Sequence, residues 1–393
     1  MSEIYFDNSA TTRPYEECAR IVYDALLSDF ANPSSLHRAG NDVRKKIETA
    51  REEILKTLSA DAQRYKLVFT GGGSEANNLA ILGTLRSKKW HSKPKILAGA
   101  GEHPSVTNAL LCAEAEGAEV VFISTAGGEI DMEMLAREAD ERVVFCTFMT
   151  VNNETGALYN VKEAFSAVRR RAPECVCHTD AVQAYLKTNL SVAALGADMI
   201  SISAHKVHGP KGIGALIVNS DVLKRRLLSP VVYGGGQETG LRAGTENSPY
   251  ILGFAASAKK AREEMPKLKS TALDLYEYIK KAVGELDGFS INEPKTRVNH
   301  IISITMPDIK SETMLHHLSA YGISVSSGSA CSSHSQDTSP ALAAFGLERE
   351  DADCTIRVSL CAQNTREEAE RFIAALSEGA SRLVRIRRTK RKK

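Results

Sequence analysis

The sequence predicts an α/β fold, with a large domain built on a mostly parallel sheet flanked by helices and a second, smaller α+β domain. Its 393 residues exceed what one hydrophobic core normally serves, so two domains are expected. Short apolar segments alternate with helical segments along the chain, which is typical of a parallel sheet covered on both faces. Hydrophobic residues make up 43% and charged residues 25%, as in ordinary globular enzymes.

The large domain can be followed element by element. Apolar residues recur at helical spacing over residues 41–58, and residues 65–70 have the composition of a strand. Glycines at 71–73 then form a turn that opens a helix from Glu75 to about Leu85. The remaining expected strands are 96–98, 119–123, 143–149, 175–178, 198–203 and 214–218, with helices at 106–116 and 132–139.

A charged helical stretch at about 257–282 connects to the second unit. This unit has its own strands at 300–305 and 355–360 and a final helix near 366–382. We assign residues 13–260 to the large domain, and residues 1–12 together with 261–393 to the smaller one. In the smaller domain, residues 325–340 form a polar loop and residues 384–393 a basic tail.

The composition also predicts the compartment. No run of about 18 apolar residues occurs, so no membrane span is expected. The N-terminus lacks the basic start and apolar stretch of a signal peptide. The eight cysteines include no C-x-x-C pair and no disulfide framework. We therefore expect a cytoplasmic protein.

Cys175 and Cys177, followed by His178, invite interpretation as a metal site. A strand alternates its faces, and buried small side chains explain the spacing of these cysteines better. We predict no metal site.

The C-terminal tail is strongly basic. Seven Lys and Arg residues lie between Arg385 and Lys393, and without them the chain carries about five net negative charges. A solvated, disordered end is the favoured interpretation. The alternative is a tail that docks an acidic carrier protein or RNA. We expect no direct binding of nucleic acid.

Polar residues follow the predicted strands where each one ends. In open α/β sheets, ligands bind beyond the carboxyl ends of the strands. The turn at 71–74 offers bare amides, the Ser74 hydroxyl and a positive helix end, which together suit a phosphate group. It is not a P-loop, because no Lys-Ser/Thr pair follows the glycines. The other polar residues at strand ends are His103, Asn153, Asp180, Gln183, His205 and Lys206.

Lys206 is the most informative of these residues. It lies where an apolar strand runs into a glycine-rich turn, flanked by His205 and His208. Partial desolvation there lowers an amine's pKa and suits it to forming a Schiff base with a carbonyl cofactor. A lysine, an acid for a pyridine nitrogen and a donor for a ring oxygen match the needs of pyridoxal 5′-phosphate. Taken singly, Asp180 has an alternative as a helix N-cap and His103 as a loop histidine.

Two residues of the smaller domain are candidates for catalysis and substrate binding. Cys331 lies among serines and glycine in a polar loop, and such exposure suits a nucleophilic thiol. Cys112 and Cys146, in apolar periodic contexts, fit core packing instead. Arg357 lies on a short strand and could clamp a carboxylate through its fork of donors. The alternative is a surface arginine on that strand.

These motifs resemble those of cysteine desulfurases of the NifS/IscS type, which are class-V aminotransferase-like enzymes of fold-type I that depend on pyridoxal phosphate. The resemblance covers nearly the whole chain, and the spacing after Cys331 resembles the branch with a long, flexible cysteine loop. The motifs that carry it are residues 5–12, 70–78, 102–104, 151–154, 178–183, 203–206, 234–238, 242–247 and 327–331.

The resemblance implies a cofactor role for most of these residues. Lys206 would form the Schiff base, and His103 would stack on the ring and move protons. Asp180 would pair with the pyridine nitrogen, and Gln183 would contact the 3-oxygen. The residues implied to hold the phosphate are Gly73, Ser74, Ser203, His205 and Thr245, the last reaching in from the partner subunit of a homodimer.

The resemblance also implies the reaction. Asn153, beside the cofactor, and Arg357 would bind the carboxylate of L-cysteine. The Cys331 thiolate would take the substrate's sulfur as a persulfide, and L-alanine would leave. The sulfur would then pass to an acceptor protein, such as an iron–sulfur scaffold or a tRNA-thiolation enzyme.

Three departures from the family pattern affect what is implied. Ser74 replaces a common threonine, Thr239 stands where an arginine is usual, and Cys361 begins a segment that usually starts with glycine. Two other classes stay open. One is a related enzyme using the same lysine, namely a selenocysteine lyase or a small-amino-acid aminotransferase. The other is a non-catalytic scaffold that binds a sulfur-carrier partner.

Overall fold

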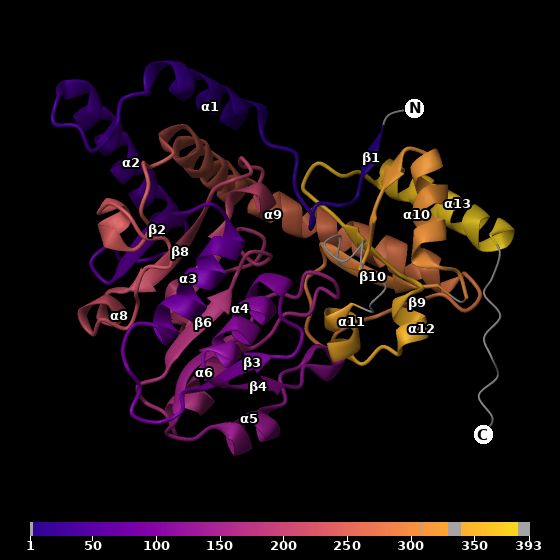
Figure 1. Ribbon diagram of the computed structural model, residues 1–393. Helices are drawn as coiled ribbons and strands as arrows, with labels where there is room; N and C mark the ends of the chain where they lie inside the picture. The colour runs from indigo at the N-terminus through magenta and orange to yellow at the C-terminus, as the bar shows by residue number, and fades with distance from the viewer. Residues whose placement is uncertain (1–2, 307, 329–338, 384–393) are drawn as a thin grey trace.

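A seven-stranded sheet forms the centre of the protein in the computed structural model, which describes residues 3–306, 308–328 and 339–383. The strand order is β2-β8-β7-β6-β5-β3-β4 (Figure 1). Only β8 runs antiparallel to its neighbours β2 and β7, so the prediction of a mostly parallel sheet is confirmed. The strands are β2 (Tyr65–Thr70), β3 (Lys95–Gly99), β4 (Glu119–Ile123), β5 (Val143–Thr147), β6 (Val176–Asp180), β7 (Met199–Ser203) and β8 (Gly214–Asn219).

Helices cover both faces of this sheet. On one face, buried side chains of α3 and α4 pack on strand residues such as Phe145 and Leu216. On the other face, α2, α6 and the first half of α9 pack on residues such as Leu97 and Ile202. The strands are therefore apolar on both sides, as expected for a buried parallel sheet. The helices are α1 (Glu16–Ser28), α2 (Arg38–Thr57), α3 (Gly73–Leu85), α4 (Pro104–Ala115), α5 (Met132–Glu138), α6 (Val161–Arg169), α7 (Val192–Leu195), α8 (Ser220–Lys224) and α9 (Ser248–Gly284).

Helix α9 is longer than the sequence pattern predicted. It begins at Ser248, because the Asn247 side chain accepts a hydrogen bond from the Tyr250 amide and Pro249 occupies the first turn. Its first half contributes Phe254 to the core around the large sheet. Its second half contributes Tyr276 to a separate core cluster in the C-terminal part of the chain.

The second core cluster lies under a smaller sheet. Strands β12 (Ser326–Ser327), β13 (Thr355–Ser359), β10 (Ile301–Thr305) and β9 (Ser290–Ile291) pair antiparallel in that order. Strand β1 (Ile4–Tyr5) pairs with β11 (Ile323–Ser324), which brings the N-terminal segment to this end of the molecule (Figure 1). The domain boundaries themselves stay a prediction. The helices here are α10 (Ser311–Ala320), α11 (Pro340–Phe345), α12 (Arg349–Ala352) and α13 (Arg366–Arg382).

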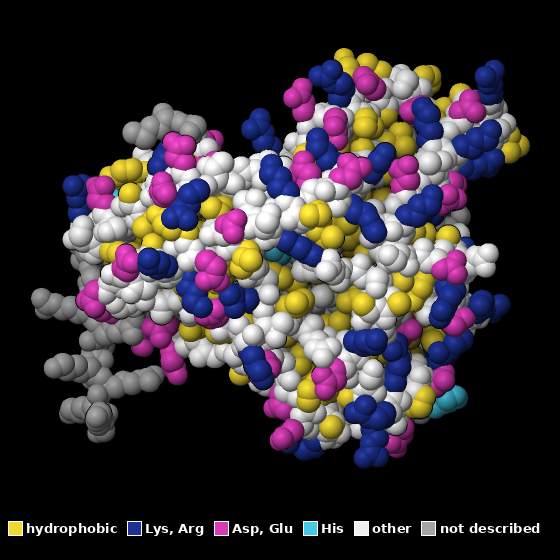
Figure 2. Space-filling model, turned by 180° about the vertical axis from the view of Figure 1, so that it is seen from behind, with side chains coloured by type: hydrophobic (Ala, Val, Ile, Leu, Met, Phe, Trp, Pro, Cys, Tyr) yellow, Lys and Arg dark blue, Asp and Glu magenta, His cyan; other side chains and the backbone are white. Residues whose placement is uncertain are grey.

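The surface mixes charges of both signs. Figure 2 shows acidic and basic side chains interspersed over one face, with hydrophobic side chains between them. Within the described ranges, no helix has both the length and the apolar character needed to cross a membrane.

Candidate active site

The carboxyl ends of β6 and β7 and the start of α3 border one cavity of about 240 Å³. Arg357 reaches the same cavity from the smaller sheet. The structure thus brings together most of the residues that the sequence indicated. Those that line the cavity are Gly73, Ser74, His103, Asn153, Asp180, Gln183, Ser203, His205, Lys206 and Arg357.

Two predicted site residues are not among those lining the cavity. Thr245 is exposed, as it would be if it served a partner subunit. Cys331 and most of the predicted loop at 325–340 lie outside the described residues, as does the basic tail at 384–393.

Lys206 follows β7 in a short 3-10 turn. Its Nζ donates hydrogen bonds to the backbone oxygens of Ser9 and Ala10, at 2.6 and 2.7 Å. The N-terminal segment, nearly 200 residues away in sequence, therefore forms one wall of the site. These two carbonyl oxygens hold the amine at the cavity wall.

Asp180 is the last residue of β6 and is buried. Its Oδ2 accepts a hydrogen bond from Asn77 Nδ2 at 2.8 Å, and its Oδ1 accepts one from the Val182 amide at 2.9 Å. Two donors therefore fix the position of the carboxylate. Asn77 was not singled out from the sequence, although it lies one helical turn after Gly73 on α3 and so faces the same site.

His103 caps the start of α4. Its Nδ1 accepts from the Ser105 amide at 3.1 Å, and the Ser105 hydroxyl lies 2.8 Å from the same atom. Because Nδ1 is an acceptor, the neutral ring carries its proton on Nε2. Burial lowers the pKa of His103; Asp180 opposes this effect and Lys206 adds to it. The ring is thus neutral near pH 7. Its Nδ1 can accept a proton only if the hydrogen bond from the Ser105 amide is broken.

A candidate phosphate-binding site lies at the N-terminus of α3. Gly72 precedes the helix with φ +152° and ψ −179°, a backbone conformation open essentially to glycine alone. Gly73 allows a close approach, since an added Cβ would lie 2.8 Å from Val182 Cγ2. The Ser203 hydroxyl is buried and has no hydrogen-bond partner among the described residues. Helix amides and an unsatisfied hydroxyl fit an anionic group.

Arg357 brings a buried positive charge to the opposite side of the cavity. Its Nη2 pairs with Asp7 Oδ1 at 2.9 Å, and its Nη1 donates to the Asn153 backbone oxygen at 3.0 Å. Its Nε has no partner among the described residues. A guanidinium held by two contacts with a donor to spare can bind a carboxylate.

Gln183 lies one turn after Asp180. Its Nε2 donates to the Ser9 backbone oxygen at 2.8 Å, and its Oε1 accepts from Lys187 Nζ at 3.2 Å. Neither Ser9 nor Lys187 was assigned a role from the sequence. Ser9 lay inside a recognised motif, but no local pattern indicated that its carbonyl would meet Lys206.

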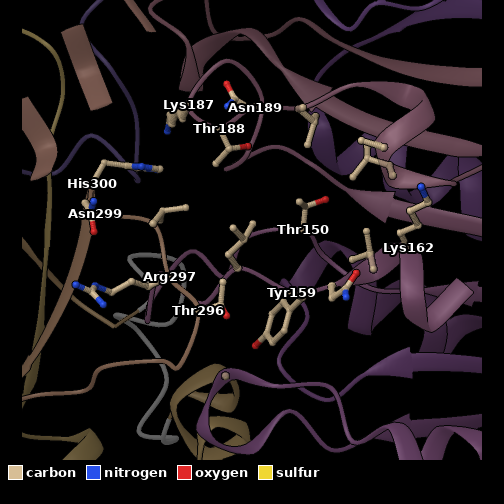
Figure 3. Close-up of a pocket in the computed structure, with 18 of the residues that line it drawn as sticks. Thr150, Tyr159, Lys162, Lys187, Thr188, Asn189, Thr296, Arg297, Asn299 and His300 are labelled. Carbon is tan, nitrogen blue, oxygen red and sulfur yellow. The ribbon is translucent and has the colours of Figure 1, made fainter. Parts of the chain in front are cut away.

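A second, larger cavity of about 850 Å³ is lined by Lys187, which donates a hydrogen bond to Gln183 of the active-site cavity (Figure 3). Its lining includes Tyr159, Lys187, Arg297 and His300, and none of the site residues predicted from the sequence. We place the candidate active site in the smaller cavity, because the smaller one holds Lys206, Asp180 and His103 together.

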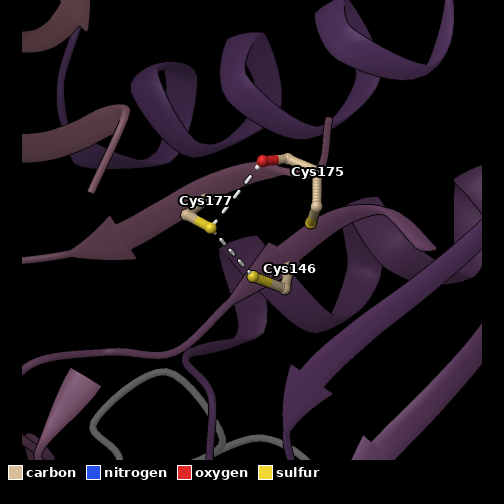
Figure 4. Close-up of side chains that lie close together, drawn as sticks. All are labelled: Cys146, Cys175 and Cys177. Carbon is tan, nitrogen blue, oxygen red and sulfur yellow. Dashed lines mark hydrogen bonds between the residues drawn. The ribbon is translucent and has the colours of Figure 1, made fainter. Parts of the chain in front are cut away.

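Three cysteines lie close together at β5 and the start of β6. Cys175, just before β6, and Cys177 were expected to be buried small side chains, and their Sγ atoms and that of Cys146 lie within 4.8 Å of one another (Figure 4). The parallel register places Cys146 opposite Cys177, with their sulfurs 3.5 Å apart. Burial of all three confirms core packing of small side chains. The absence of a metal there stays a prediction.

Two departures from the family pattern can be located. Thr239 is exposed, with a left-handed φ of 57°, while the preceding Glu238 is buried. Glu238 Oε2 pairs with Arg51 Nη1 at 2.8 Å and accepts from the Phe69 amide at 2.9 Å, which ties this segment to β2. The Cys361 amide donates to Asn364 Oδ1 at 2.7 Å. Neither Thr239 nor Cys361 lines the active-site cavity.

Comparison with known proteins agrees with the motifs. The aminotransferase class-V family matches residues 4–372. A cysteine desulfurase of Trichormus azollae is 37% identical over 388 residues, which cover 98% of this chain and 94% of that protein. Cysteine desulfurase IscS 1 of Archaeoglobus fulgidus is 32% identical, covering 96% of this chain and 97% of that protein.

Solved structures agree as well. A NifS-like protein superposes with a TM-score of 0.89 and 32% identity, covering 97% of this chain and 100% of that one. The structure of SspA in complex with cysteine superposes with a TM-score of 0.79 and 29% identity, covering 93% of this chain and 100% of that one. The chain therefore belongs to the aminotransferase class-V family and to the NifS/IscS type of protein within it.

Proposed function

We propose that this protein is a cysteine desulfurase that uses pyridoxal 5′-phosphate to take sulfur from L-cysteine and release L-alanine. The observation that carries the proposal is the convergence of Lys206, Asp180, His103 and Gln183 on one cavity of about 240 Å³. The relatives named cysteine desulfurase and the cysteine complex of SspA support the choice of substrate.

The residues present fit the cofactor. Its phosphate suits the N-terminus of α3 with the Ser74 and Ser203 hydroxyls, the second of which lacks a partner, and with His205 beside them. Burial lowers the pKa of His205 to about 3, so this ring is neutral and can donate or accept a hydrogen bond. Asp180, fixed by two donors, suits a protonated pyridine nitrogen.

When bound, the cofactor supplies an electron-withdrawing ring for the amino group of the substrate. The chain's own residues then handle the protons. Lys206 Nζ, at the cavity wall, is the base that takes the proton from the substrate Cα. The neutral ring of His103 is the second acid–base group, and Asp180 would hold the pyridine nitrogen of the cofactor.

Residues that line the cavity opposite the phosphate site orient the substrate. Arg357, whose Nε has no partner among the described residues, and Asn153, which also lines the cavity, bind the α-carboxylate. The Cys331 thiolate attacks that sulfur. The substrate's Cβ–S bond breaks, the electron pair stays with the carbon fragment, and protonation of that fragment yields alanine. The outer sulfur remains on Cys331 as a persulfide.

The persulfide sulfur passes to an acceptor protein, either an iron–sulfur scaffold or a tRNA-thiolation enzyme. We also infer that the enzyme works in the cytoplasm, where thiols stay reduced. The seven cysteines within the described ranges are all free, which supports this inference.

We propose a homodimer in which Thr245 of each protomer serves its partner's phosphate site. Several large apolar side chains are exposed on α1 and just beyond it, which is unusual unless another chain covers them. They are Tyr23, Leu26, Leu27, Phe30 and Leu36.

The cofactor assignment is tested with Lys206→Ala and, as a matched control, Lys211→Ala, an exposed lysine five residues further along the same loop. The unaltered protein and the Lys211 variant should bind pyridoxal phosphate and show its absorption in the visible region. After borohydride reduction and gel filtration under denaturing conditions, the unaltered protein and the Lys211 variant should retain the cofactor covalently, and the Lys206 variant should lose it. A colourless unaltered protein that binds no pyridoxal phosphate would favour the scaffold alternative.

A further inference from the structure

A second lysine lies behind the proposed active site. Lys187 is only 8% exposed, and its Nζ lies 3.2 Å from Gln183 Oε1. Figure 3 shows it at the wall of the larger cavity, near His300. No carboxylate among the described residues forms an ion pair with it. A buried cation whose partner is a neutral amide carries a cost in stability, and this cost calls for a function.

Hydrogen bonds connect this lysine to Lys206. Lys187 Nζ donates to Gln183 Oε1, and Gln183 Nε2 donates to the Ser9 backbone oxygen at 2.8 Å. Lys206 Nζ donates to the same oxygen at 2.6 Å. The sequence of contacts therefore runs from the wall of one cavity to the reactive amine of the other.

The chemistry of the donors fixes the orientation of the Gln183 amide. A lysine ammonium has hydrogens to donate and no lone pair to accept. Gln183 must therefore turn its oxygen toward Lys187, which leaves its NH₂ group facing Ser9 and the active-site cavity. Without Lys187 only the Ser9 oxygen would hold the amide in this orientation, so its NH₂ group would be directed less firmly at an electron-rich oxygen of a ligand.

We propose that Lys187 is a positioning residue for the cofactor site: it holds Gln183 with an N–H directed at the ring oxygen of pyridoxal phosphate. The inference rests on the proposed function and deepens it. Lys187 itself does not line the active-site cavity, and its hydrogen bond to that site is made to Gln183.

The local charges are consistent with this role. Burial, together with the positive charges of Lys206 and Arg357, lowers the pKa of Lys187 to about 7, against an opposing effect of Cys361. A bound phosphate and ring oxygen bring negative charge near these cations and so favour the protonated form of Lys187. The ammonium is the form that fixes the amide.

A double-mutant cycle tests the proposal, with Lys187→Met, Gln183→Met and the combined variant, each side chain replaced by an apolar one of similar length. The probe is pyridoxal phosphate, titrated into cofactor-free protein, with its dissociation constant and the absorption maximum of the bound cofactor as readouts. Lys187→Met should weaken binding about five- to tenfold and move the absorption maximum. In the Gln183→Met background, the same change should have no further effect on either readout.

Lys162→Met is the matched control, because Lys162 lines the larger cavity without a hydrogen bond to Gln183. It should bind the cofactor like the unaltered protein. Circular dichroism checks that each variant folds, and Lys187→Gln, which keeps a donor, should restore part of the affinity if the Met variant folds poorly. Unchanged binding and absorption in Lys187→Met, or an equal loss in both backgrounds, would overturn the proposal. An unaltered protein that does not bind pyridoxal phosphate would overturn the proposed function and this inference together.

Discussion

The role of Arg357 in binding the substrate carboxylate is open to a quantitative test. The structure gives its guanidinium two contacts, to Asp7 and to the Asn153 backbone, and leaves its Nε without a partner among the described residues. A hydrogen bond to a charged group contributes about 1.5–3 kcal/mol, which corresponds to roughly a 10- to 150-fold change in affinity. Arg357→Lys keeps the charge but removes the fork of donors, so we expect a loss of about tenfold.

Two product-like inhibitors separate carboxylate binding from other effects. L-Alanine carries the carboxylate, whereas L-alaninamide does not. Arg357→Lys should raise the inhibition constant of L-alanine about tenfold and leave that of L-alaninamide nearly unchanged. Arg51→Lys serves as a control, because Arg51 is also a partly buried arginine in an ion pair, with Glu238, outside the cavity. An equal loss for both inhibitors, or the same loss in the control, would refute the reasoning.

Two further predictions concern the elements that build the site. Gly72→Ala should lower the free energy of unfolding by about 1–3 kcal/mol, because the positive φ of Gly72 strains a side chain although nothing lies within 4 Å of the position of an added Cβ. Thermal unfolding measures this beside Gly284→Ala, where the Cβ position is equally open and the backbone is helical. Equal shifts in the two variants would contradict the prediction. Glu102 is buried, and burial followed by the charge of Asp180 raises its pKa to about 8. The native state then holds a proton that the unfolded state releases above about pH 4.5, so stability should fall as pH rises from about 4.5 to 8, by at most about 5 kcal/mol. Urea unfolding at pH 5 and pH 8 should show a steeper loss for the unaltered protein than for Glu102→Gln, and parallel losses would contradict the assignment.

Much of the fold follows from local patterns. The boundaries of β2 and β4 match the predicted strands, since turn residues on both sides delimit short apolar runs there. Helix α9 was predicted nine residues too short at its start, because its first two turns are apolar and buried and do not show the alternation of a surface helix. Strand β5 ends two residues earlier than expected, because the apolar run continues past the last strand hydrogen bond.

The site, like the fold, contains some residues that the sequence predicts and some contacts that it does not. Residues at the ends of strands, such as Asp180 and Lys206, could be predicted because parallel strands end at a common edge. Contacts that depend on tertiary register could not. Ser9 meets Lys206 across nearly 200 residues, and Cys146 meets Cys177 only because of the pairing of β5 with β6. Lys187 gave no signal, because its value as a buried donor depends on where Gln183 turns its amide.

The most direct test of the proposed function is the release of sulfide and alanine from L-cysteine in the presence of a reductant, measured side by side for the unaltered protein and Cys331→Ala. We predict equal amounts of alanine and sulfide from the unaltered protein, and neither product from the variant, although the variant keeps the absorption of the bound cofactor. Turnover that survives the loss of Cys331 would contradict the persulfide route and favour a selenocysteine lyase or another reaction at the same lysine.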